Sequence, residues 1–203
     1  MCIINPDDIV YADAGELYLE KERGIIMTVK EALEKRYSVR GFKETKLSAE
    51  EINEILLAGL HSPTGCNKQE IHFSVIDGDN PILKELEEEK NRLRNITNAT
   101  KIFYYDAPVL FVLSGESDFQ WSHIDAGIAV QSMALRAEEM GLGSLILGCV
   151  YDAMHGEKQE YFEKALGIPD NFEFEIALAV GHKDATKEPH TFDKDSQVTI
   201  IDN

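Results

Sequence analysis

The chain has 203 residues, of which 43% are hydrophobic, and this is typical of one globular domain with short appendages. Its net charge of -17, from 37 acidic and 20 basic residues, opposes nonspecific binding to nucleic acid and to anionic membranes. The sequence shows no apolar run of the roughly 18 residues that a membrane span needs and no basic leader, so we expect a cytoplasmic protein. A site for an anionic ligand must then be built locally.

The first 26 residues are acidic, contain Pro6, Gly15 and Gly24, and show little periodicity. We therefore expect an irregular N-terminal arm over residues 1–26, followed by one domain over residues 27–203 that includes the C-terminal tail. No repeat or low-complexity tract divides this domain.

The first half of the domain is predicted to contain three helices and one strand. A helix over residues 28–35 is followed by a second, which begins at the capping box 48–51 and ends before Pro63. Residues 71–76 alternate between apolar and polar and indicate a strand. The highly charged segment 82–94, with several acid-base pairs four residues apart, predicts a helix that faces solvent.

The second half begins with a continuous apolar run over residues 109–113, which predicts a buried strand. Apolar positions nearly encircle the helix expected over residues 124–140, so we place it at the centre of the core. Two further strands over residues 145–150 and 174–180, a helix over 157–166 between them and a last strand over 197–201 complete the prediction.

Two short segments carry the chemistry. In Arg36-Tyr37-Ser38-Val39-Arg40, an extended backbone presents two guanidinium groups and a hydroxyl on one face, which suits a phosphate. Taken alone, the two arginines also fit a solvated surface. The turn-prone segment Ser62-Pro63-Thr64-Gly65-Cys66-Asn67-Lys68-Gln69 offers neutral donors and acceptors that suit the hydroxyl and amide parts of a nucleotide cofactor.

The two segments resemble the FMN-binding signature of the nitroreductase family. The resemblance runs from about Met27 to Gly181 and includes Asp106-Ala107-Pro108 before a strand, Asp125-Ala126-Gly127-Ile128-Ala129-Val130-Gln131 in a long helix, and Gly141-Leu142-Gly143. One such motif recurs by chance in many proteins, whereas these motifs stand in the family's order. The resemblance implies an α+β fold, with a mixed β-sheet flanked by helices, in a domain-swapped homodimer that exchanges a C-terminal strand.

The resemblance also implies roles for individual residues. Arg36 and Ser38 match phosphate contacts, and Arg40 matches the residue at the pyrimidine edge of the flavin. Asn98 and Lys101 resemble a pair that some members use at that edge, although they also fit a polar surface loop. A backbone N–H within 146–149 would face flavin N5, while the same residues also fit a core strand. The candidate cofactor-binding residues are Arg36, Tyr37, Ser38, Arg40, Ser62, Pro63, Thr64, Asn67, Gln69, Asn98, Lys101, Ile146, Leu147 and Gly148.

No catalytic side chain and no metal ligand is predicted, because the six histidines show no ligand spacing. Cys2, Cys66 and Cys149 lack a CxxC spacing, so we expect free thiols. The short connection 114–121 replaces the family's longer lid, and its Phe119 and Trp121 fit either an aromatic wall for a flat substrate or an anchor for the next helix.

The function that follows is an FMN-dependent oxidoreductase that uses NADH or NADPH to reduce a small-molecule acceptor, such as a nitroaromatic, a quinone or a flavin, by ping-pong hydride transfer. Two alternatives stay open. One is a specialised flavoenzyme of the same fold, and the other is a non-catalytic FMN-binding or electron-transfer module, which the acidic composition would suit.

Overall fold

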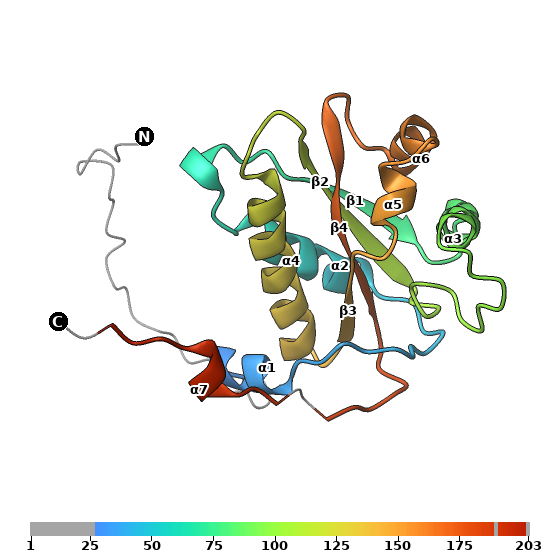
Figure 1. Ribbon diagram of the computed structural model, residues 1–203. Helices are drawn as coiled ribbons and strands as arrows, with labels where there is room; N and C mark the ends of the chain where they lie inside the picture. Colours follow the sequence, from blue (N-terminus) through green and yellow to red (C-terminus); the bar gives the residue numbers. More distant parts are fainter. Residues whose placement is uncertain (1–26, 189–190, 202–203) are drawn as a thin grey trace.

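The computed structural model describes residues 27–188 and 191–201, so the arm predicted over residues 1–26 lies outside the described residues. At its centre is a four-stranded sheet with helices on both faces (Figure 1). The strands are β1 (His72–Asp77), β2 (Val109–Glu116), β3 (Gly143–Leu147) and β4 (Phe172–Gly181). Their order in the sheet is β1-β2-β4-β3, and every neighbouring pair is antiparallel.

The segment 36–40 adds a short parallel contact to the outer edge of β3. Ser38 bridges Ser144, and the backbone N of Val39 donates to the carbonyl oxygen of Ser144 at 3.0 Å. The sheet is therefore mixed and the fold is α+β, as predicted. The contact also places the arginine-rich segment at the β3 edge.

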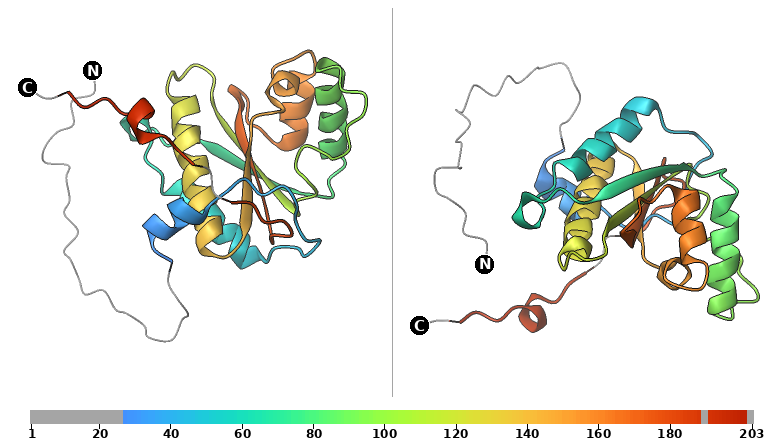
Figure 2. Two further views of the ribbon diagram at one scale, coloured as in Figure 1. Left: turned by 60° about the horizontal axis from the view of Figure 1, so that its bottom comes forward. Right: turned by 90° about the horizontal axis from the view of Figure 1, so that it is seen from above.

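Helices cover the two faces of the sheet separately (Figure 2). One face carries α2 (Ala49–Leu60) and α4 (Ser122–Glu139), with α1 (Val29–Lys35) packed against α4. The other face carries α3 (Ile82–Leu93), α5 (Tyr151–Met154) and α6 (Gln159–Leu166). The sheet thus separates two apolar cores. No helix in the described ranges is both long and apolar enough to cross a membrane.

The helix starts follow from local sequence. Thr28 caps α1 and Ser48 caps α2, each in a capping box with the glutamate three residues later. These reciprocal hydrogen bonds satisfy backbone donors that would otherwise lack partners. Both helices begin where the sequence predicts.

The prediction that the charged helix faces solvent is wrong for one side of α3. Ile82, Leu83 and Leu86 are buried against the sheet, and Glu87 and Lys90 are buried with them. The two charged side chains pair with each other, which offsets the free energy of removing them from water. The helix is therefore amphipathic and part of the fold's second layer.

The strand predicted over residues 197–201 is also not formed. Gln197 ends a short helix, α7 (Lys194–Gln197), and Val198 and Ile201 follow without regular structure. The tail runs away from the sheet, and none of the four described strands pairs with it (Figure 1). Its apolar side chains stay in solvent, and Ile201 is 89% exposed.

Candidate functional site

The segment 36–40 is held with alternate side chains inward. Val39 is fully buried, whereas Arg40 is exposed, as an extended backbone requires. The hydroxyl of Tyr37 donates to the carbonyl oxygen of Ala185 at 2.9 Å, which ties the segment to the chain that leaves β4. The face that carries the two arginines and the serine is thereby turned away from the core.

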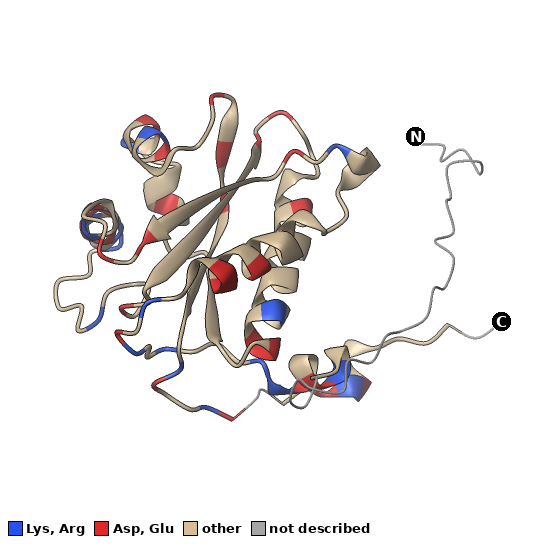
Figure 3. Cartoon of the chain, turned by 180° about the vertical axis from the view of Figure 1, so that it is seen from behind, with Lys and Arg blue, Asp and Glu red and all other residues tan. Residues whose placement is uncertain are grey.

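Beside this segment lies a cavity of about 320 Å³, which we call the basic pocket. Its lining residues are Arg40, Lys90, Lys101, Ile102, Phe103, Tyr105, Leu145, Ile146, Leu147, Gly148 and Cys149. Three of these residues are cations, and none of the described residues in this lining is a carboxylate. In Figure 3 acidic positions are spread over the helices and loops, so a carboxylate-free cavity is distinctive in this chain.

The basic pocket unites predicted residues from three distant parts of the sequence. Arg40, Lys101 and the strand end 146–148 all line it. β3 stops at Leu147 rather than continuing to Val150, so the backbone from Gly148 turns out of the sheet. Asn98 is exposed and does not line the pocket.

Sequence reasoning missed Lys90, which α3 directs into the basic pocket. The side chain is 8% exposed and its Nζ lies 2.9 Å from Glu87 Oε2. The available signal was helical spacing, because Lys90 follows Leu83 by seven residues and Leu86 by four and so shares their face.

Cys149 also lines the pocket as a free thiol. Burial raises the pKa of this thiol, so it stays protonated at neutral pH. Cys66 is disulfide-bonded, and the prediction of a free thiol is wrong for this residue. Spacing along the chain carries no information on a pairing that only proximity in space creates.

The second predicted segment, residues 62–69, forms a compact turn that we call the amide loop. Thr64 Oγ1 accepts a hydrogen bond from the backbone N of Gln69 at 2.9 Å, which closes the turn. Cys66, Asn67 and Gln69 have φ angles of 55°, 53° and 55°. Left-handed conformations of residues other than glycine are strained, and several within four positions are typical of a functional loop.

The amide loop is anchored to α4. The hydroxyl of Ser62 bonds that of Ser132 at 2.9 Å, and the backbone N of Gly65 donates to Asp125 Oδ2 at 2.7 Å. A Cβ on Gly65 would lie 3.1 Å from Trp121 and 3.2 Å from Phe119. The aromatic pair therefore packs against the loop, and Trp121 is still 43% exposed.

Carboxyl groups lie behind the amide loop with little cationic compensation. Glu70 is 4% exposed and neither of its carboxyl oxygens has a hydrogen-bond partner among the described residues. Its pKa is raised by burial and by the neighbouring Asp125. Burial, then Glu173 and Glu70, raise the pKa of Glu175 to about 7. This part of the molecule favours protonated carboxyls.

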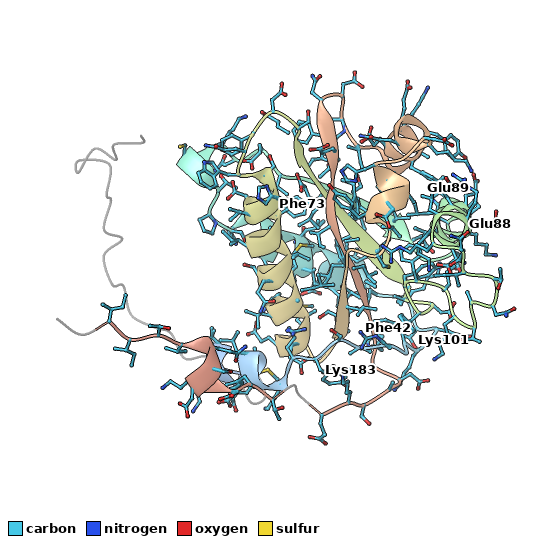
Figure 4. All side chains as sticks on the ribbon, viewed as in Figure 1. Phe42, Phe73, Glu88, Glu89, Lys101 and Lys183 are labelled. Atoms are coloured by element: carbon cyan, nitrogen blue, oxygen red, sulfur yellow. The ribbon has the colours of Figure 1, made fainter. Side chains whose placement is uncertain are left out.

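The basic pocket and the amide loop do not meet within the chain. Ser62, Thr64 and Gln69 line a separate cavity of about 40 Å³ with Phe73, while Pro63 and Asn67 are exposed. β1 and β3 are opposite edges of the sheet, and Phe73 and Lys101 lie far apart in Figure 4. The two groups of predicted site residues thus lie apart within one chain.

The fold and the basic pocket define a protein that can bind an anionic ligand with a flat apolar part, since cations and strand residues share one cavity. A sequence model described as the nitroreductase family matches residues 33–182. The chain belongs to the nitroreductase family.

Known relatives agree with this assignment. A protein of Archaeoglobus fulgidus, provisionally named NADH dehydrogenase/NAD(P)H nitroreductase, is 29% identical over 153 residues, covering 75% of this chain and 84% of the relative. A nitroreductase of Desulfitobacterium hafniense with bound FMN superposes with a TM-score of 0.77 at 27% identity, covering 86% of this chain and 98% of the other. An FMN-bound nitroreductase of Bacteroides fragilis gives a TM-score of 0.76 at the same identity and coverage.

Proposed function

We propose that this protein is an FMN-dependent oxidoreductase that takes electrons from NADH or NADPH and delivers them to a small electrophilic acceptor. The observation that carries the proposal is the basic pocket, with three cations and no carboxylate in its described lining, in a chain of net charge -17. The FMN-bound relatives and their fold support the choice of cofactor.

The residues present fit FMN. Apolar strand residues such as Ile146 and Leu147 suit a flat ring, and the face of Arg36 and Ser38 beside the pocket suits a phosphate. When bound, FMN would supply the redox chemistry, passing two electrons from the nicotinamide to a nitroaromatic, a quinone or another flavin in a ping-pong cycle. The protein's part is to position the reactants and to stabilise negative charge, which Arg40 and Lys101 are placed to do.

We further propose that the complete site forms in a homodimer. The amide loop of one chain cannot serve the basic pocket of the same chain, because they lie on opposite edges of the sheet. Apolar side chains that a dimer would cover are exposed on α1 and α4, including Val29 at 71%, Leu33, Ile124 and Ile128. Such an exposed apolar face is typical of an interface.

The C-terminal tail is the second element that a partner would cover. Phe192, Ile200 and Ile201 are exposed, and α1 and α4 flank a cavity of about 300 Å³ that includes Val29 and Leu135. We propose that the tail of each chain packs on its partner, which would bury these side chains and give residues 197–201 a strand to pair with. The chain is expected to act in the cytoplasm.

The function is tested with purified protein. We expect a flavin absorbance spectrum, bleaching on anaerobic addition of NADH or NADPH, and steady oxidation of the nicotinamide once menadione or a nitroaromatic is added. A protein that holds FMN without turnover would instead favour the electron-transfer module, for which its acidic composition is apt. A protein that retains no FMN would contradict the proposal.

The shared site is tested by mixing subunits. Arg36→Ala removes the proposed phosphate contact and Asn67→Ala removes an amide-loop contact, and each homodimer should bind FMN weakly. In the heterodimer, one of the two sites regains both intact segments, so half of the parent's tight binding should return. A monomer that binds FMN and turns over at full rate would refute the shared site.

A further inference from the structure

Lys90 is a cation of the basic pocket for which neither the sequence motif nor the proposed function supplies a role. It reaches the pocket from α3, on the layer opposite α2 and α4, while Arg40 and Lys101 come from loops. The two loop cations are exposed, but Lys90 is 8% exposed. A charge removed from water interacts more strongly with a bound ligand than one surrounded by solvent.

Glu87 fixes the position of Lys90 by hydrogen bonding. Its Oε1 accepts hydrogen bonds from Lys90 Nζ at 3.0 Å and from Asn91 Nδ2 at 2.8 Å, and its Oε2 accepts one from the backbone N of Phe103 at 2.9 Å. Glu87 does not line the basic pocket, whereas Lys90 does. The pair is therefore a dipole with its positive end toward the cavity.

The same carboxylate also positions the wall of the pocket that Phe103 forms. Phe103 lines the pocket two residues after Lys101, so the bond from its backbone to Glu87 fixes the loop that carries the second cation. Lys90 Nζ lies 6.0 Å from the centre of the Phe103 ring. Glu87 thus fixes the position of Lys90 directly and that of Lys101 through the loop that carries it.

We propose that Lys90 is a third cation for the flavin of the basic pocket, acting on the reduced ring, and that Glu87 is the residue that positions it. The inference rests on the proposed function. The ion pair with Glu87 offsets the free-energy cost of burying the charged Lys90 side chain. Because a reduced flavin carries more negative charge than an oxidised one, a fixed cation stabilises the reduced form more.

The experiment compares Lys90→Met with Lys84→Met, an exposed position on the same helix outside the basic pocket. Both changes remove one positive charge from α3. We expect Lys90→Met to weaken binding of reduced FMN relative to oxidised FMN by about tenfold, which is a fall of about 30 mV in the two-electron potential. Lys84→Met should leave the potential at the parent value. The potential is measured against a reference dye, and FMN affinity is measured in parallel.

Lys90→Arg tests whether the charge itself is responsible, and it covers the case in which Lys90→Met does not fold. The arginine variant should keep the potential closer to the parent than the methionine variant does. The role of Lys90 is overturned if the potential of Lys90→Arg falls as far as that of Lys90→Met. It is also overturned if Lys90→Met and the parent have equal potentials. If the parent itself binds no FMN, the proposed function fails first, so the two failures are distinguishable.

Discussion

The basic pocket and the amide loop differ in how the buried acids near them are stabilised. Around the basic pocket, buried acids have cationic partners: Glu87 pairs with Lys90, and Glu89 pairs with Arg92 and Lys158. Behind the amide loop, Glu70 is equally buried but has no hydrogen-bond partner among the described residues. Glu70 thus lacks the paired cation that Glu87 and Glu89 have.

The difference indicates how an acidic chain can build an anion site. Arg40, Lys90 and Lys101 line the basic pocket. Lys90 and Arg92 also pair with acids of α3. The amide loop presents neutral groups. Burial raises the pKa of Glu70 and Glu175 near it and so favours their protonated forms. We therefore expect charge removal to matter most on the pocket side, and steric or pH changes to matter most on the loop side.

The largest effect is expected from Arg36→Ala. Loss of one charge-assisted phosphate contact, about 1.5 to 3 kcal/mol, should weaken FMN binding by roughly tenfold to a hundredfold, as measured by fluorescence titration. Lys43→Ala is the control, since Lys43 is an exposed cation on the same connection but outside the segment 36–40. Equal losses in both variants would mean that only overall charge matters.

Glu89→Gln should lower the free energy of unfolding by about 2 kcal/mol at pH 7, because a carboxylate bound to two cations loses its charge. Hydrogen bonds from Arg92 and Lys158 lower the pKa of Glu89 to about 2. Its contribution is therefore complete above the pKa of the unfolded chain and disappears as the pH falls toward 2.

Urea denaturation at several pH values measures this effect. The difference between parent and Glu89→Gln should shrink steadily below about pH 4. Glu157→Gln is the matched control, because Glu157 is 89% exposed and lies 3.8 Å from Arg92, a geometry that contributes little. If the difference in the free energy of unfolding does not depend on pH, packing rather than charge accounts for the contribution of Glu89.

On the loop side, Gly65→Ala should destabilise the protein by roughly 1 to 2 kcal/mol, because the added methyl group presses on Phe119 and Trp121. We expect FMN retention to fall with it, since the amide loop must shift. Adding Phe119→Ala should restore part of the stability by making room, as a double-mutant cycle would measure. If the losses of stability in the two variants are additive, Gly65 and Phe119 are not energetically coupled.

The smallest effect is expected from Glu70→Gln, which should stabilise the protein by up to about 1 kcal/mol at pH 8 and by nothing at pH 4. Burial and Asp125 raise the folded pKa of Glu70, so its neutral form is favoured and stability falls as the pH rises through that value. Glutamine keeps the shape without the charge. Glu50→Gln, at an exposed position on α2, should show no such pH dependence in thermal melts.

Much of the fold was predictable because its signals are local. The capping residues Thr28 and Ser48 set the starts of two helices, and the continuous apolar run 109–113 marks the central strand β2. The extended segment 36–40 also has the alternation that its sequence predicts, with Val39 buried between outward residues. Each of these features depends on neighbours within a few positions.

The sequence by itself determined most helices and strands of the sheet and the residue types of the segments 36–40 and 62–69, because periodicity and side-chain type are properties of short segments. Only the tertiary structure decided that Lys90 faces the basic pocket, that Cys66 is disulfide-bonded and that the tail before Ile201 has no strand partner among the described residues. It also decided that the basic pocket and the amide loop lie apart. The physical reason is that burial and pairing depend on which surfaces meet across the sheet, and residues distant in the sequence make those contacts.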